Sequence, residues 1–206
     1  MNRSCMQHRD LKVKDYKAVR AENGDLYLEG HFAVFNSPYF LWENGIEYIM
    51  PGAFTKTLID NPDVRALYNH NVDLILGRTK SGTLVLSEDE TGLFARIKIN
   101  PDDSEAMNAY ERVKRGDIDQ CSFGFDIVDE DYEYTDGKSI WKIKEVRLYE
   151  VSPCVFPAYE ETSVSARKKS LEDIEKRKTQ EWQQCQLRKL KGEKNNAENF
   201  NAQERA

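Results

Sequence analysis

Two short segments of the chain carry side chains that can perform acyl-transfer chemistry. Residues 66–71 read ALYNHN and end a strand-like run at His70. Residues 121–125 read CSFGF and place Ser122 in a second apolar run. A serine hydroxyl attacks a carbonyl group only when a base removes its proton, and imidazole is the usual base. If the fold brings His70 to Ser122, the two residues supply a base and a nucleophile.

Each of these residues also has a purely structural interpretation. A lone serine in a strand usually packs or faces solvent, and Ser122 lacks the Gly-x-Ser-x-Gly context of α/β-hydrolases. Cys121 is a rival nucleophile, but neighbours on a strand face opposite ways, so only one of the two can face His70. Among the other histidines, His8 in the polar N-terminus is expected to be solvated. A structural role is favoured for His31, which lies in an apolar strand.

An imidazole base needs a partner that fixes its tautomer and stabilises its cation. The carboxylates considered for this role are Glu47, Asp63, Asp73, Glu145 and Glu150. Strict alternation along residues 144–153 places Glu150 on the same strand face as Val146 and Leu148. A buried carboxylate is costly unless it is paired, so this position favours Glu150. A strand-end carboxylate turned to solvent is the alternative.

The elements that must position these residues are mostly strands. We expect strands at residues 16–20, 26–35, 46–50, 64–68, 83–86, 93–99, 120–128 and 140–156. We expect helices at residues 51–59 and 104–115, the second ending at Gly116. Because no repeating βαβ pattern is present, the order predicts an antiparallel α+β domain or a small closed barrel.

Size and charge predict one folded domain with extensions. The chain has 206 residues, of which 39% are hydrophobic and 32% charged. We expect an N-terminal extension over residues 1–12, a domain over 13–166 and a charged, mobile, partly helical tail over 167–206. From residue 166 onward there are 11 basic and 7 acidic residues, a net of +4, so the remainder carries −10. An acidic body argues against nucleic acid as a partner.

Cysteine usage and hydropathy exclude several other classes. The four cysteines are scattered, with no paired spacing and no Cys/His cluster, so neither a disulfide framework nor a metal site is expected. No apolar run approaches the roughly 20 residues of a membrane span. The N-terminus lacks the apolar core of a signal peptide, so we expect a cytoplasm-like compartment and no membrane partner.

The order of these motifs resembles the prohead serine proteases of tailed bacteriophages, which are related to the herpesvirus assemblins. The resemblance covers residues 27–164. The segments that carry it are GHFAVF at 30–35, Glu47 with MPGAF at 50–54, ALYNHN at 66–71, LGR at 76–78, ETGL at 90–93, GDI at 116–118, SFGF at 122–125, LYEVSP at 148–153 and FPAY at 156–159.

The resemblance implies a serine endopeptidase with a mostly antiparallel, assemblin-like β-barrel surrounded by helices. His70 and Ser122 match the base and the nucleophile of the family. Assemblins use a second histidine on the strand after the nucleophile, and no histidine follows His70 here. Glu150 lies on the corresponding strand and is expected to be the third member, with Glu47 in reserve. No cofactor is implied.

The resemblance also implies where the chain acts and on what. The expected site of action is the assembling procapsid in the host cytoplasm. The expected substrates are the major capsid protein's scaffolding segment or a separate scaffold, and the chain itself, with self-association as a further expectation. The basic tail suits anchoring in the procapsid or removal by self-cleavage. Two alternatives stay open: a non-catalytic capsid-assembly or scaffold protein that retains the fold, and a cysteine hydrolase that uses Cys121.

Overall fold

The computed structural model describes residues 6–12, 15–60 and 63–155, together with residues 176, 179, 180 and 183. The expected domain boundaries at residues 13 and 166 lie outside these ranges, as does nearly all of the expected tail over 167–206. Residues 7–12 form a strand of the main sheet. Among the described residues, no helix is long and apolar enough to cross a membrane.

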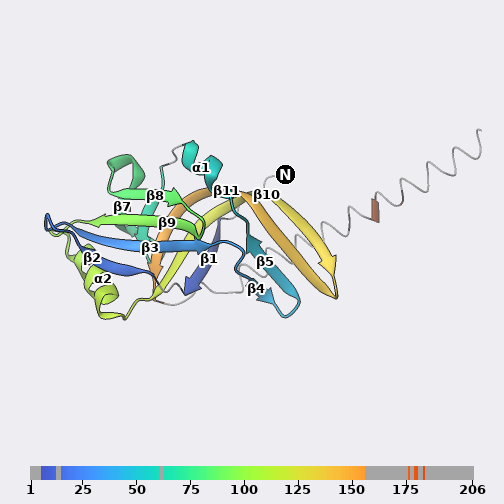
Figure 1. Cartoon of the computed structure of the whole chain (residues 1–206), viewed down its shortest axis with the longest axis horizontal. Coiled ribbons are helices and arrows are strands. Elements are labelled where there is room, and N and C mark those ends of the chain that lie inside the picture. The colour runs from blue at the N-terminus through green and yellow to red at the C-terminus, as the bar shows by residue number, and fades with distance from the viewer. Residues whose placement is uncertain are drawn as a thin grey trace, which may run out of the picture. The chain divides into compact units, whose positions relative to one another are not determined.

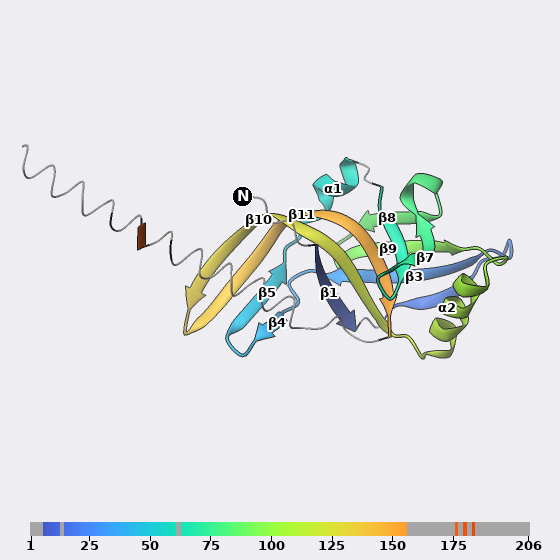
Figure 2. The same ribbon diagram turned by 180° about the vertical axis from the view of Figure 1, so that it is seen from behind.

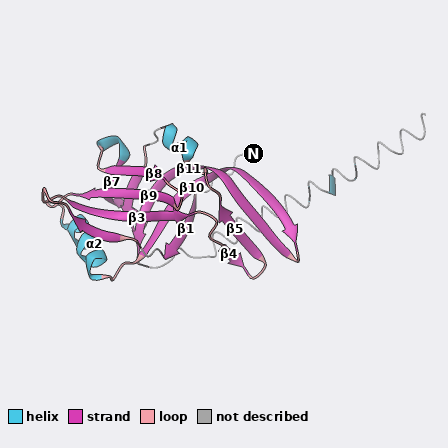
Figure 3. Ribbon diagram, in the orientation of Figure 1, coloured by secondary structure: helices cyan, strands magenta, loops and turns pink. Residues whose placement is uncertain are grey.

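The described strands form two sheets (Figures 1 and 3). The 7-stranded sheet contains, in order, β1 (Gln7–Lys12), β10 (Gln120–Thr135), β11 (Lys138–Cys154), β5 (Gly45–Ile49) and β4 (Tyr39–Trp42), with β6 (Arg65–Tyr68) paired to β11 and β7 (Asn71–Arg78) paired to β6. The 4-stranded sheet contains β2 (Lys17–Arg20), β3 (Leu26–Val34), β9 (Gly92–Ile99) and β8 (Leu84–Glu88). Most pairs are antiparallel, but β5 and β6 run parallel to β11.

The expected α+β class with mostly antiparallel strands is confirmed, but the expected closed barrel is wrong for the described part of the chain. There, no hydrogen-bonded ladder joins the two sheets. They bury their apolar faces against each other instead, and one core takes Leu28 and Ile97 from the small sheet and Phe123 and Leu148 from the large one. This face-to-face packing removes apolar surface from water without the continuous strand stagger that a barrel requires.

The β10–β11 hairpin is formed by the two longest strands and contains both Ser122 and Glu150. Its strands meet at Asp136 and Gly137, both in the left-handed region with φ of 49° and 75°, as a tight hairpin turn requires. The sequence predicted strands over residues 120–128 and 140–156, so the first strand is longer than expected. Register shifts along the ladder accompany the curvature of the hairpin across the body. Figures 1 and 2 show its tip beside β4 and β5, away from α2.

The helix expected at residues 104–115 is confirmed as α2 (Ser104–Arg115). The Asp103 carboxylate caps it by accepting from the N–H groups of Glu105 and Ala106 at 2.9 and 3.2 Å. Gly116 ends it with φ of 86°. The other expected helix is shorter than predicted, α1 (Thr55–Ile59), because residues 51–54 form turns. A 3₁₀ turn, η1 (Thr79–Ser81), follows β7.

His31 joins two loop ends of the small sheet, in line with the structural role expected for it. Its Nδ1 lies in hydrogen-bond contact with the Asp15 carboxylate, and its Nε2 lies 2.9 Å from Asp89 Oδ2. Burial opposes a charge on the ring, but hydrogen bonds to the two carboxylates outweigh it and raise the pKa of His31. The two aspartates therefore favour the charged form of His31, and the three side chains join these loops.

This pairing predicts a pH dependence of stability. Because the pKa of His31 is raised above its unfolded value, the stabilisation is complete below about pH 6.5 and is lost as the pH rises through the folded pKa. Urea unfolding between pH 6 and 9 should show the free energy of unfolding falling more steeply in wild type than in His31→Gln. Parallel curves for the two proteins would contradict the assignment.

Candidate active site

His70 lies at the tip of the β6–β7 hairpin, in a two-residue turn. Asn69 and His70 have φ of 55° and 59°, so both lie in the left-handed region. Such turns usually contain glycine, because a side chain costs roughly 1 kcal/mol there. The sequence did not predict β7, because Asn-His is not a recognisable tight-turn pair. The strain of two left-handed residues must be offset by contacts elsewhere.

The end of β11 supplies these contacts. The Asn69 N–H donates to the Pro153 carbonyl oxygen at 3.0 Å, and the His70 N–H donates to Ser152 Oγ at 3.3 Å. The Val155 N–H donates to Asn69 Oδ1 at 3.3 Å. The turn is thereby fixed to β11 on both of its central residues, which sets the position of the His70 ring.

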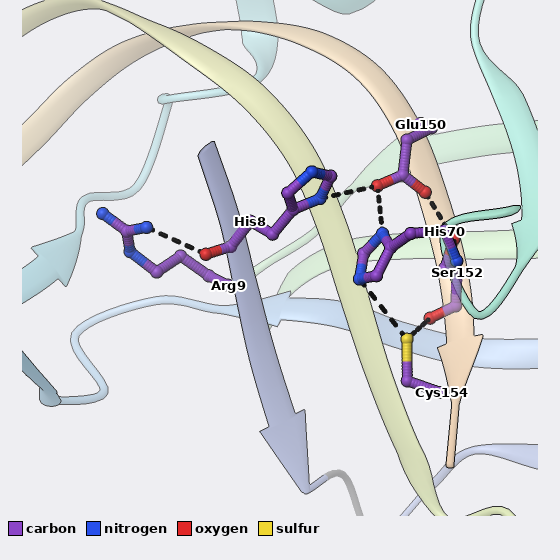
Figure 4. Close-up of polar contacts among 6 residues, drawn as sticks. All are labelled: His8, Arg9, His70, Glu150, Ser152 and Cys154. Atoms are coloured by element: carbon purple, nitrogen blue, oxygen red, sulfur yellow. Dashed lines mark hydrogen bonds and ion pairs between the residues drawn. The ribbon is translucent and has the colours of Figure 1, made fainter. Parts of the chain in front are cut away.

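Glu150 receives hydrogen bonds on both carboxylate oxygens, and its side chain is only 4% exposed (Figure 4). His70 Nδ1 lies 2.8 Å and His8 Nδ1 lies 3.2 Å from Oε1, while the Ser152 hydroxyl donates to Oε2. Burial raises the pKa of Glu150, but the hydrogen bonds with the two histidines outweigh it and the net effect lowers the pKa. The carboxylate is therefore ionised at neutral pH.

A bulge in β11 decides which way Glu150 points. Alternation in the sequence predicted that Glu150 shares a strand face with Leu148, and this prediction is wrong. The ladder pairs Glu150 with Gly124 but pairs Leu148 with Phe125, so β11 has one extra residue, Tyr149, between them. Directly opposite residues project to the same side. Leu148 consequently faces the core with Phe125, and Glu150 faces the other side of the sheet.

Ser122 lies on this second face as well. It is opposite Ser152 in the β10–β11 ladder, two residues from the Gly124–Glu150 pair. Its hydroxyl is fully buried and has no hydrogen-bond partner among the described residues. Cys121 points the other way into the core, where burial raises the pKa of its thiol. The structure thus places Ser122, and not Cys121, on the face that carries His70 and Glu150.

Three of the other four carboxylates considered from the sequence have basic partners of their own. Glu47, the reserve candidate, is 1% exposed and forms a buried ion pair with Arg9, with Nε at 2.5 Å and Nη2 at 2.9 Å. Asp63 pairs with Arg78, and Glu145 pairs with Lys56. Asp73 is exposed.

Three residues of the site, namely His8, Ser152 and Cys154, were not predicted from the sequence. His8 was expected to be solvated, but β1 pairs with β10 and places it opposite Gly124, within reach of Glu150. Nothing in residues 7–12 alternates clearly enough to predict a strand. Ser152 had a signal, since it lies two residues after Glu150 and shares its face. Cys154 shares that face too, and its Sγ lies 3.5 Å from His70 Nε2.

Gly124 leaves the space that the Glu150 carboxylate fills. A Cβ atom at this position would lie 2.6 Å from Glu150 Oε1 and 3.0 Å from its Cγ. These distances are well inside van der Waals contact, so any side chain would push the carboxylate away from both histidines. The glycine of the SFGF segment is therefore required by the close approach of Glu150.

We expect Gly124→Ala to displace Glu150 and weaken its hydrogen bond with His70. The downfield proton resonance of the His70 Nδ1–H group should shift or disappear, and stability should fall by about 1–3 kcal/mol. A double-mutant cycle supplies the control, since the same substitution in a Glu150→Ala background has no carboxylate to displace. An equal cost in both backgrounds would show that Glu150 is not the residue displaced.

Comparison with known proteins identifies the class. The chain matches the family model of the caudovirus prohead serine proteases over residues 10–177, so it belongs to that family, as the sequence motifs predicted. A curated relative is the prohead protease of Enterobacteria phage HK97, 32% identical over 149 residues. The match covers 71% of this chain and 62% of the relative, less than two thirds of its length. Among solved structures, the bacteriophage T4 capsid assembly protease is similar, with 13% identity and a TM-score of 0.43 over 74% of this chain and 95% of that one.

Proposed function

We propose that the chain is a serine endopeptidase that cleaves capsid or scaffold proteins, and itself, during maturation of a phage prohead. Ser122 is the nucleophile, His70 the base and Glu150 the acidic member. The observation that carries the proposal is the 2.8 Å contact between His70 Nδ1 and Glu150 Oε1, on the sheet face that also holds Ser122. Membership of the prohead protease family supports the reaction type.

The reaction follows from the two nitrogens of His70. With Nδ1–H donating to Glu150, Nε2 carries the lone pair. It takes the proton of the Ser122 hydroxyl once the two groups come into contact, since that hydroxyl has no hydrogen-bond partner in the described state. Ser122 Oγ then attacks the scissile carbonyl carbon and forms a tetrahedral oxyanion. Nε2–H next protonates the leaving amine, which gives an acyl-serine. A water molecule, activated by the same nitrogen, hydrolyses the acyl group and restores the hydroxyl.

Glu150 acts by holding the imidazole and stabilising its cation during each proton transfer. Because its carboxylate is buried, this stabilisation is weakly screened by solvent. Ser152 supports both residues, since its hydroxyl donates to Glu150 and accepts from the His70 N–H. In the described state the Ser122 hydroxyl is fully buried. A peptide can therefore reach it only when the groups that cover it move.

The proposed substrates are those of procapsid assembly in the host cell: the scaffolding segment of a major capsid protein or a separate scaffold protein. Self-cleavage would remove the basic segment that begins near residue 167. The residues from 166 onward carry a net charge of +4. The relative from phage HK97 is named as a prohead protease, which supports this class of substrate.

Cys154 is a competing nucleophile within the same site. Its Sγ lies 3.5 Å from His70 Nε2, so a thiol, the base and Glu150 form a continuous line of contacts. Ser122 is favoured because the chain belongs to a serine protease family. The other alternative is a non-catalytic capsid-assembly or scaffold protein that retains the protease fold.

Coexpression with the cognate capsid and scaffold proteins tests the assignment. Wild type should produce cleaved capsid or scaffold protein and a shortened chain, both detected by mass spectrometry. Ser122→Ala should lower the cleavage rate by at least about 10³-fold, and Glu150→Gln by about 10⁴-fold because it favours the wrong imidazole tautomer. Ser139→Ala is the matched control, since it removes another buried serine of the same hairpin.

Three outcomes would redirect the proposal. Full cleavage by Ser122→Ala would exclude Ser122 as the nucleophile. Loss of cleavage in Cys154→Ser together with retention in Ser122→Ala would assign the chemistry to the thiol. Binding of capsid protein by wild type without any cleavage, unchanged in all variants, would support the non-catalytic alternative.

A further inference from the structure

Two histidines from distant parts of the chain converge on one carboxylate oxygen. His8 comes from β1 and His70 from the turn between β6 and β7, and the Nδ1 atom of each faces Glu150 Oε1 (Figure 4). The centres of the two imidazole rings lie 4.2 Å apart, with their planes inclined by 63°. All three donor atoms lie within 4.8 Å of one another. The peptidase mechanism uses only one of the two histidines.

This donor set suits a transition-metal ion of the zinc class. Two imidazole nitrogens and a carboxylate oxygen, with water in the fourth position, are a common tetrahedral set. With bonds of roughly 2.0–2.1 Å, tetrahedral ligand atoms lie about 3.3 Å apart. The separations from Glu150 Oε1 are 2.8 Å to His70 Nδ1 and 3.2 Å to His8 Nδ1. Both separations from Oε1 are close to this tetrahedral value.

The two histidines are partly exposed to solvent, from which an ion can bind, and the buried Glu150 carboxylate supplies a fixed negative charge. The side chains of His8 and His70 are 27% and 21% exposed, whereas that of Glu150 is 4% exposed. Gly124 places no side chain between His8 and the carboxylate. Ser152 holds the second oxygen, Oε2, and so orients Oε1 toward the two nitrogens.

We propose that His8, His70 and Glu150 form a binding site for a divalent transition-metal ion such as Zn²⁺, and that the bound ion switches the peptidase off. The second part rests on the proposed function; the first does not. Hard cations such as Mg²⁺ and Ca²⁺ prefer oxygen ligands and do not compete for this site.

The inhibition follows from the protonation of one imidazole ring. A metal ion on His70 Nδ1 takes the lone pair of that nitrogen, so the single proton of the neutral ring moves to Nε2 through solvent. Nε2 then has no lone pair with which to accept the proton of Ser122. The ion also occupies Glu150 Oε1 and adds positive charge beside the ring, which disfavours the imidazolium that catalysis requires.

Titration of the purified full-length chain with Co²⁺ tests the site without any measurement of activity. We expect one equivalent to bind with the visible absorption of a tetrahedral ion, no thiolate charge-transfer band, and displacement by Zn²⁺ but not by Mg²⁺. His8→Gln should weaken binding by at least about tenfold. His31→Gln is the matched control and should keep wild-type affinity, because the nitrogens of His31 contact separate carboxylates on opposite sides of its ring.

Equal affinities in wild type and His8→Gln, or no saturable binding in wild type, would overturn the site. A loss of binding in Cys154→Ser with retention in His8→Gln would also overturn it, by moving the ion to Cys154 and His70 Nε2. Circular dichroism must show that each variant is folded, and Glu150→Gln provides a second removal of a ligand that keeps side-chain size.

Peptide cleavage with and without Zn²⁺ then tests the switch. Inhibition that needs a markedly higher Zn²⁺ concentration in His8→Gln supports the switch, and inhibition equal in both proteins overturns it. Binding of Co²⁺ that depends on His8, in a chain that cleaves no substrate even without metal, would support the site and overturn the proposed function.

Discussion

The buried Glu150 carboxylate is the constraint on which the rest of the site depends. A charge shielded from solvent is stable only where hydrogen bonds replace its water, and here they come from His70, His8 and Ser152. These donors belong to a hairpin turn, an N-terminal strand and β11, so three elements far apart in the sequence must meet at one side chain. Gly124 is needed because the carboxylate lies directly against its backbone. The hydrogen bonds that stabilise the buried Glu150 carboxylate also orient the His70 imidazole. The stability of the site and the orientation of the ring therefore depend on the same contacts.

Local signals predict the elements of this chain better than their pairing. The start and end of α2 follow from Asp103 and Gly116, neighbours that cap it directly. The turn at residues 136–137 likewise depends on its own two residues, Asp136 and Gly137, which both adopt positive φ. β7 was missed because its turn uses Asn69 and His70 in conformations that glycine usually adopts. The choice between a closed barrel and two open sheets depends on which strand edges pair. Hydrophobic alternation within one strand does not predict which edge that strand pairs with.

The same difference between local signals and long-range contacts applies to the candidate site. Residue type and strand context made His70 and Ser122 candidates, and the family resemblance made them the expected base and nucleophile. Glu150 was singled out for a reason that the structure contradicts, because the bulge at Tyr149 reverses the face that alternation predicts. The contact of His8 with Glu150 spans 142 residues and had no local signal at all. Long-range meetings of polar side chains are set by the tertiary fold, and single-sequence patterns contain almost no information about them.

The length of the β10–β11 hairpin has a consequence for the order of folding. Closing a small loop costs less entropy than closing a large one, so such a ladder forms most easily outward from its turn at residues 136–137. The rung that joins Ser122 to Ser152 lies near the open end, beyond the register shifts at Gly124–Phe125 and Ile127–Asp129. A slip of one residue anywhere along the ladder would turn Ser122 into the core. Ser122, the proposed nucleophile, therefore reaches its place only when the whole ladder has closed in the correct register, and the rung that places it opposite Ser152 is among the last to form.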